Sequence, residues 1–306
     1  MDLKNTPYGK PAYLERLYWR KQVKKGELPI VDTICIWTDI CGFGNELANA
    51  GMNLQDFINN GMHEALELLH DKFTSPGHFV YEDLGLMSKD THDRAIIIND
   101  GVAKVIDVLD GNIYSHSISR YLANIIISHW QALNCLHERY NGKLGLRTVI
   151  SSGQRMQYTN EQKLGSEFVF HGDGISDVGN DFMATTFCSI PKQLQMNTAL
   201  ARCYLIESSG SRNGIERNGF YIDESVLKLL TKKLKKSELS ISHKSILFRN
   251  RKLDALELDK IKDIKFKHNL FETMVYRIGK AKIGFGLESE EVLFDVSDIG
   301  VDPFDA

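Results

Sequence analysis

The distribution of apolar and polar residues predicts strands and helices in alternation. Residues 31–37 (VDTICIW) are apolar and β-branched, which is typical of a buried strand. Residues 39–44 (DICGFG) interrupt this pattern, and residues 45–73 then have helical spacing. The beginning of the domain is therefore predicted as a strand, a glycine turn and one long helix.

Two further strands are predicted at 94–99 and 101–109, and they meet at Asn99-Asp100-Gly101. Asn and Asp followed by Gly between apolar runs are typical of a tight hairpin turn. Asp100 is therefore expected at the tip of a hairpin.

Helical and strand patterns continue to alternate downstream. A helix that starts at Pro191 and ends near Glu207 is predicted, because proline suits a first helical turn. Short strands joined by lysine-rich connections are expected near the C-terminus. The predicted elements are a helix at 115–140, strands at 144–151 and 220–222, and short strands at 246–248 and 273–278. This order predicts one α/β domain.

The two ends of the chain differ from its middle. Residues 1–29 place an apolar stripe among basic residues, which indicates an amphipathic helix that packs on the body or on a partner subunit. Residues 281–306 are acidic and are expected to form a flexible or partner-clasping tail. We therefore expect the functional domain to span residues 30–280.

Composition excludes several classes of protein. The 306 residues are 42% hydrophobic and carry a net charge of −3, which is unlike a nucleic-acid-binding protein. No apolar run reaches the roughly 20 residues that cross a bilayer, and no signal sequence precedes the domain, so a soluble cytoplasmic protein is expected. The five cysteines form no CxxC pair and the ten histidines no HExxH, which favours reduced thiols and no structural zinc.

Two aspartates have a setting that suits metal and phosphate chemistry. Asp39 follows a buried strand and precedes a glycine turn, whose backbone N–H groups can hold phosphate. Asp100, at a hairpin tip on a neighbouring strand, could converge on it, and two carboxylates can hold the two divalent ions of a phosphoryl transfer. An Asp at a strand end and an Asp-Gly pair in a hairpin are each commoner as plain turn residues, so that interpretation stays open.

The sequences of these segments resemble the signature motifs of a known family, the class III adenylate and guanylate cyclases. Residues 37–43 (WTDICGF) are similar to the family's F-S-D-I-x-G-F signature, and Asn99-Asp100 stands where the family has Gly-Asp. Residues 146–153 (LRTVISSG) look like the family strand that ends in a small residue and glycine. Phe266-Lys267-His268 and Val275-Tyr276 resemble its L-K-G and V-Y elements. These similarities occur in family order across about residues 30–278.

The resemblance implies a ferredoxin-like βαββαβ core with a central, mostly antiparallel sheet flanked by helices. It also implies that Asp39, the carbonyl of Ile40 and Asp100 bind two Mg²⁺ or Mn²⁺ ions, and that Gly42 and Phe43 offer N–H groups to the phosphates of a nucleoside triphosphate.

Further roles follow from the same resemblance. Lys267 would contact phosphate, unless it is an ordinary solvated lysine. Arg202 would match the transition-state arginine of the family, which puts Thr198 at the asparagine position and Asn197 beside it; alternatively, neither Arg202 nor Asn197 touches substrate. A head-to-tail homodimer is implied, with the metals on one protomer and Lys267 and Arg202 on the other.

The position that reads a purine base in the family is Ile96 here. This departure resembles the pyrimidine cyclases of bacterial Pycsar antiphage systems, which make cyclic CMP or cyclic UMP for a separate effector. Arg94 shares a strand face with Ile96 and Asp100, and its donors suit cytosine O2 and N3; alternatively, it pairs with a neighbouring aspartate. Trp37 either stacks on a base or fills the core.

Two alternatives to a pyrimidine cyclase remain open at this stage. The first is an adenylate or guanylate cyclase with altered base recognition. The second is a catalytically degenerate cyclase fold that serves as a nucleotide-binding or dimerisation module.

Overall fold

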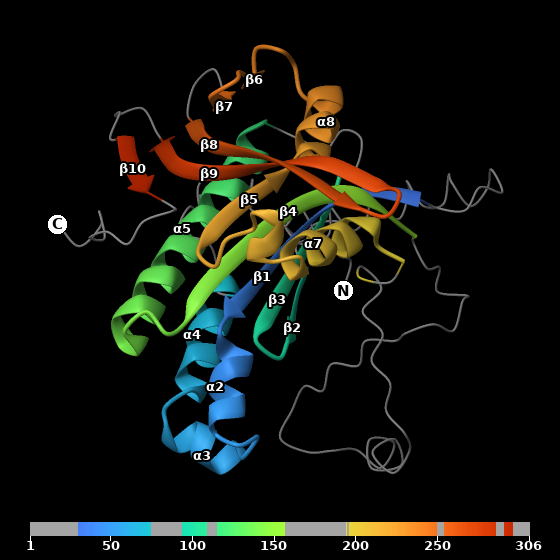
Figure 1. The fold of residues 1–306 in the computed structure, drawn as a ribbon. Helices are drawn as coiled ribbons and strands as arrows, with labels where there is room; N and C mark the ends of the chain where they lie inside the picture. The colour runs from blue at the N-terminus through green and yellow to red at the C-terminus, as the bar shows by residue number, and fades with distance from the viewer. Residues whose placement is uncertain are drawn as a thin grey trace, which may run out of the picture.

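A computed structural model describes residues 30–74, 94–108, 115–156, 194, 196–249, 254–285 and 291–295. Their fold is mixed α/β, with a central, mostly antiparallel ten-stranded sheet flanked by helices (Figure 1). The strand order is β2-β3-β1-β4-β5-β9-β8-β7-β6, with β10 beside β9, and the pair β4–β5 is parallel.

The strands are β1 (Ile30–Cys41), β2 (Arg94–Ile98), β3 (Gly101–Asp107), β4 (Gly145–Met156), β5 (Gly219–Asp223), β6 (Leu239–Ile241), β7 (Ser245–Arg249), β8 (Asp254–His268), β9 (Phe271–Phe285) and β10 (Glu291–Asp295). The helices are α2 (Phe43–Asn49), α3 (Leu54–Asn59), α4 (His63–Thr74), α5 (Ser115–Tyr140), α7 (Thr198–Ser208) and α8 (Glu224–Lys233), and a 3₁₀ turn covers Ser211–Asn213.

The first half of the domain has the predicted βαββαβ arrangement. Helices α2 to α4 connect β1 to β2, a tight hairpin joins β2 to β3, and α5 connects β3 to β4. The strand order β2-β3-β1-β4, with each neighbouring pair antiparallel, is that of a ferredoxin-like core. The predicted architecture is therefore confirmed.

Side chains of β1 point alternately to the two faces of the sheet because successive residues of a strand face opposite ways. Ile34 and Ile36 belong to a large core that includes residues of α4, α5 and α8. Cys35 and Trp37 belong to a second core that α7 covers. By the same alternation, Asp39 lies on the α7 face.

The predicted single helix over 45–73 is wrong. The chain forms α2, α3 and α4 instead, separated by turns in which Gly51 and Gly61 have positive φ angles of 62° and 74°. Glycine adopts this left-handed conformation without steric cost, so these two positions end the helical turns. The Asn53 side chain then caps α3 by accepting from Gln55 N at 2.9 Å.

The C-terminal predictions are also corrected. In place of short strands with lysine-rich connections, β8 and β9 form a hairpin of two 15-residue strands. The lysines of β8 alternate with buried Ile264 and Phe266, a period of two that indicates a strand. Part of the predicted acidic tail is strand β10, which pairs with β9.

The helix predicted to start at Pro191 begins at Thr198. The Asn197 side chain caps it by accepting a hydrogen bond from Leu200 N at 3.0 Å. Pro191 and the predicted helix within 1–29 lie outside the described residues. Of the four described cysteines, Cys35 and Cys203 are buried as predicted, whereas Cys41 and Cys135 are only partly buried. Within the same described residues, no helix combines the length and the apolar character that crossing a membrane requires.

Candidate active site

Asp39 and Asp100 lie on neighbouring strands at one end of the sheet. Asp39 lies within β1 rather than after it, opposite Gly101 of β3 and Arg147 of β4. The Ile40 N–H donates to the Asp100 carbonyl at 3.0 Å, which fastens the hairpin tip to β1. The left-handed Asn99, with φ 54°, makes the turn that places Asp100 there. Sheet register thus brings the two predicted metal ligands together.

The Asp39 carboxyl lies in an unusual electrostatic setting. Burial raises its pKa from 3.8 to about 8, and the nearby Glu207 and Asp100 carboxylates add to this rise, while Arg147 opposes it. Burial also raises the pKa of Glu207, and Arg147 again opposes the rise. Three carboxyl groups and one arginine therefore share this partly buried region, and a bound cation would favour the ionised form of Asp39.

Arg147 and Glu207 are site residues that sequence reasoning missed. Arg147 is 9% exposed and forms an ion pair with Glu207, and it also donates to the backbone carbonyls of Glu207 at 2.9 Å and Glu216 at 3.0 Å. An arginine inside the apolar strand 144–151 was the available signal, because a charged side chain in such a run requires a buried partner. Glu207 supplies that partner from the last turn of α7.

The donor set fits a hard divalent cation. Asp39 and Asp100 provide carboxylate oxygens, and the Ile40 backbone provides a carbonyl, which are ligand types that Mg²⁺ and Mn²⁺ prefer. No group of three or more His, Cys, Asp or Glu side chains within the described ranges is arranged to hold a metal ion. An ion at this place would therefore complete its coordination with water and substrate oxygens, as Mg²⁺ commonly does.

The glycine turn after β1 is tightly enclosed. Gly42 has φ 97°, and a Cβ at this position would approach the Lys143 carbonyl to 2.8 Å and the Arg217 Nη2 to 3.1 Å. The exposed Arg217 donates to the Cys41 carbonyl at 3.4 Å, so its guanidinium lies over the turn. Phe43 is buried against Phe57, with ring centroids 4.9 Å apart. Arg217 is a further cation beside the predicted phosphate-binding backbone, and no sequence motif pointed to it.

Trp37 fills the core on the α7 face. Its side chain is 6% exposed and meets Tyr204 edge-on, with ring centroids 6.0 Å apart. Ile96 packs against the same apolar cluster. Arg94 opens β2, but its side chain lies outside the described part of the structure, so its role in base recognition stays a prediction.

Arg202 is engaged within its own protomer. Its Nε donates to Asp223 Oδ2 at 2.7 Å, and its Nη2 donates to Asp223 Oδ1 at 3.0 Å and to Thr273 Oγ1 at 3.2 Å. The Asp223 side chain is fully buried, and the Arg202 guanidinium also lies 4.5 Å from the Phe271 ring centroid. Arg202 is therefore not a simple surface charge of the helix.

The other residues predicted for the transition state have local structural contacts. Asn197 caps α7, and the Thr198 hydroxyl accepts from Gln154 N at 2.8 Å and donates to Gln154 O at 3.0 Å. Lys267, near the tip of the β8–β9 hairpin, forms an exposed ion pair with Glu272. None of the contacts described for these residues, or for Arg202, involves Asp39 or Asp100, so their catalytic roles would require a second subunit.

Gly101→Ala is expected to disturb the site without removing a charged group. The added Cβ would meet the Trp37 ring at 2.6 Å and Asp39 Oδ1 at 3.3 Å, so the indole must shift. We expect a loss of about 1–3 kcal/mol in a urea-unfolding measurement. Gly44→Ala is the matched control, since nothing lies within 4 Å of its Cβ and alanine favours helix α2. Equal stability of the two variants would contradict the close packing of Trp37 on the hairpin.

Comparison with known proteins gives similarity at the level of structure. No family model matches the chain, and no curated protein matches it. A solved guanylyl cyclase, Cya2, aligns with 86% of this chain and 96% of its own, at 10% identity and a TM-score of 0.44. The adenylyl cyclase CyaB from P. aeruginosa aligns with 82% of this chain and 94% of its own, at 12% identity and a TM-score of 0.40.

Proposed function

We propose that this protein is a divalent-metal-dependent nucleotidyl cyclase that converts a pyrimidine nucleoside triphosphate, CTP before UTP, into the 3′,5′-cyclic monophosphate and pyrophosphate. The main observation behind the proposal is that Asp39 and Asp100 lie next to each other across the β1–β3 pair. The region around them holds more carboxyl groups than cations. The motif resemblance of the segments around both residues supports the same chemistry.

The residues of this site have distinct roles in the proposed reaction. Divalent ions held by Asp39, Asp100 and the Ile40 carbonyl would activate the ribose 3′-hydroxyl and neutralise the departing pyrophosphate. Gly42 and Phe43 would orient the phosphates through backbone N–H groups, and Arg217 adds a cation over that turn. Trp37 and the apolar residues packed around it form the core beside these residues.

The reaction would need a second copy of the chain. Arg202 and Lys267 have their contacts away from Asp39 within one protomer, and a head-to-tail homodimer would bring them to the partner's metal residues. The base would then meet β2, where Ile96 offers no hydrogen bond and Arg94 is the proposed reader of cytosine. A role in antiphage defence, with the cyclic nucleotide sensed by a separate effector, is a further part of this proposal.

A panel of the four ribonucleoside triphosphates, incubated with the full chain and Mn²⁺, tests the activity. We expect cyclic CMP as the main product and cyclic UMP as the minor one, resolved by mass spectrometry. Cyclic AMP or cyclic GMP alone would replace the pyrimidine assignment with a purine cyclase. Absence of any cyclic product, combined with nucleotide binding, would favour a catalytically degenerate binding module.

A further inference from the structure

The Arg217 side chain lies across two glycines at one end of the sheet. Gly42 and Gly145 are close together there, because the residue before Gly42 pairs with Gly145 in the β1–β4 register. A Cβ at Gly145 would come within 2.8 Å of Arg217 Cγ and 2.9 Å of its Nε, and a Cβ at Gly42 within 3.1 Å of its Nη2. The space that both glycines leave free therefore determines where the Arg217 guanidinium lies.

Arg217 lies on the same face of the sheet as Asp39. Successive residues of a strand face opposite ways, so Gly145 and Arg147 of β4 share a face. The register pairs Arg147 with Asp39, which places Asp39 on that face as well. The two-residue step from Arg147 to Gly145 is about 7 Å long. Arg217 therefore lies about one such step from Asp39, on the side of the glycine turn.

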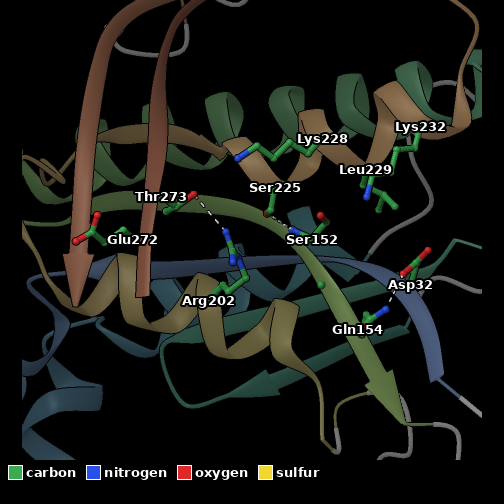
Figure 2. A pocket seen from close by; sticks show the side chains of 11 residues that line it. Asp32, Ser152, Gln154, Arg202, Ser225, Lys228, Leu229, Lys232, Glu272 and Thr273 are labelled. Carbon is green, nitrogen blue, oxygen red and sulfur yellow. Dashed lines mark hydrogen bonds between the residues drawn. The ribbon is translucent and has the colours of Figure 1, made fainter. Parts of the chain in front are cut away.

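Three arginines near this face differ in their partners. Arg147 is paired with a carboxylate of α7. In Figure 2, Arg202 points toward Thr273, to which it donates at 3.2 Å, and its guanidinium also binds the buried Asp223. Arg217 is exposed, no ion pair joins it to another described residue, and its hydrogen bond to a backbone carbonyl of β1 is 3.4 Å long. Of the three, Arg217 is the one whose N–H donors are free to bind a ligand.

A guanidinium in this place suits a phosphate group. Its forked donors match two phosphate oxygens, and the resulting charge-assisted hydrogen bonds are strong. If ions at Asp39 and Asp100 bind the α-phosphate of a nucleoside triphosphate, the other two phosphates extend beyond them and carry most of the negative charge. Carboxyl groups outnumber cations around Asp39 itself, whereas the exposed cation Arg217 stands at the glycine turn.

We propose that Arg217 binds the terminal phosphates of the substrate and holds the pyrophosphate that leaves. The inference rests on the proposed function, and it adds a residue that selects a triphosphate over a nucleotide with fewer phosphates. In the reaction, the ribose 3′-oxygen bonds to the α-phosphorus and its proton passes to solvent. The oxygen between the α- and β-phosphorus atoms leaves with the electron pair of the broken bond as part of pyrophosphate, and Arg217 stabilises the charge that develops there.

Isothermal titration calorimetry of the full chain with pyrophosphate and Mg²⁺ tests this role. Pyrophosphate has the terminal phosphates of any nucleoside triphosphate and no base, so the result does not depend on which base is recognised. We expect Arg217→Met to weaken pyrophosphate binding by about tenfold or more, because charge-assisted hydrogen bonds are lost. The Tm should stay close to that of the wild type, since Arg217 is exposed.

Arg249→Met is the matched control. It removes the same charge from an exposed arginine of β7, which four strands separate from β1 in the sheet. We expect this variant to bind pyrophosphate as tightly as the wild type does.

Three results would overturn the inference: a wild type that does not bind pyrophosphate, an Arg217→Met variant that binds it as tightly as the wild type, or equal losses in Arg217→Met and Arg249→Met. The proposed function is tested separately by product formation from the four nucleoside triphosphates. Arg217-dependent pyrophosphate binding in a chain that forms no cyclic product would contradict the proposed function and leave Arg217 as a phosphate-binding residue. Product formation together with unchanged pyrophosphate binding in Arg217→Met would remove the role of Arg217 alone.

Discussion

Asp39→Asn is expected to reduce cyclic nucleotide formation by about 10³-fold or more. The asparagine retains the size of the side chain but loses a charged metal ligand, and a catalytic metal contributes several kcal/mol of transition-state stabilisation. Product formation in the presence of Mn²⁺ measures this effect. Asp56→Asn, at an exposed position in the first turn of α3, is the control and should retain full activity.

The same substitution should stabilise the metal-free protein at alkaline pH. The Asp39 pKa is about 8 in the folded protein and 3.8 for an ordinary aspartate, so the unfolded chain ionises first as the pH rises. The free energy of unfolding of the wild type therefore falls between about pH 4 and pH 8, and asparagine removes this loss. We expect Asp39→Asn to be more stable by roughly 2–5 kcal/mol at pH 9 and nearly equal at pH 4.

Divalent metal should reverse this difference. Mn²⁺ binds the ionised carboxylate, so it should raise the Tm of the wild type more at pH 8 than at pH 6, and leave that of Asp39→Asn nearly unchanged. A destabilised Asp39→Asn at pH 9, or an equal Mn²⁺ response in both proteins, would contradict the metal site. Thermal unfolding followed by circular dichroism with and without EDTA distinguishes these outcomes.

Arg202→Met is expected to lower both stability and activity. It leaves the fully buried Asp223 without its bidentate partner, and losing one member of a buried ion pair typically costs about 3–5 kcal/mol. Urea unfolding measures this loss. A reduction in activity alone would therefore not identify Arg202 as a catalytic residue.

The double variant Arg202→Met with Asp223→Asn separates the two contributions. Removing the unpaired charge should recover most of the stability, because the introduced asparagine can still hydrogen-bond to Ser225 and Thr273. If Arg202 acts in the partner's site as proposed, activity stays low while stability returns. Recovery of activity together with stability would reduce Arg202 to a structural residue.

Elements of the fold were predicted correctly where a short stretch of sequence is enough to specify them. The hairpin at Asn99-Asp100 and helix α5 were predicted correctly, since turn residues and helical spacing are visible in short windows. The region 45–73 was predicted wrongly because Gly51 and Gly61 interrupt a continuous helical pattern, and a glycine inside such a pattern is compatible with either outcome. Strand β8 was missed because its lysines masked the alternation of its buried residues.

The sequence by itself determined that Asp39 lies between an apolar strand segment and a glycine turn and that Asp100 lies at a hairpin tip, because both depend on local backbone preferences. Only the tertiary structure decided that these two carboxylates meet, since this depends on the register of β1 against β3. Likewise, the Arg147–Glu207 pair beside Asp39, and the Arg202–Asp223 pair, join residues 60 and 21 positions apart. Such pairs are set by how α7 packs across the sheet, which no short segment of the sequence encodes.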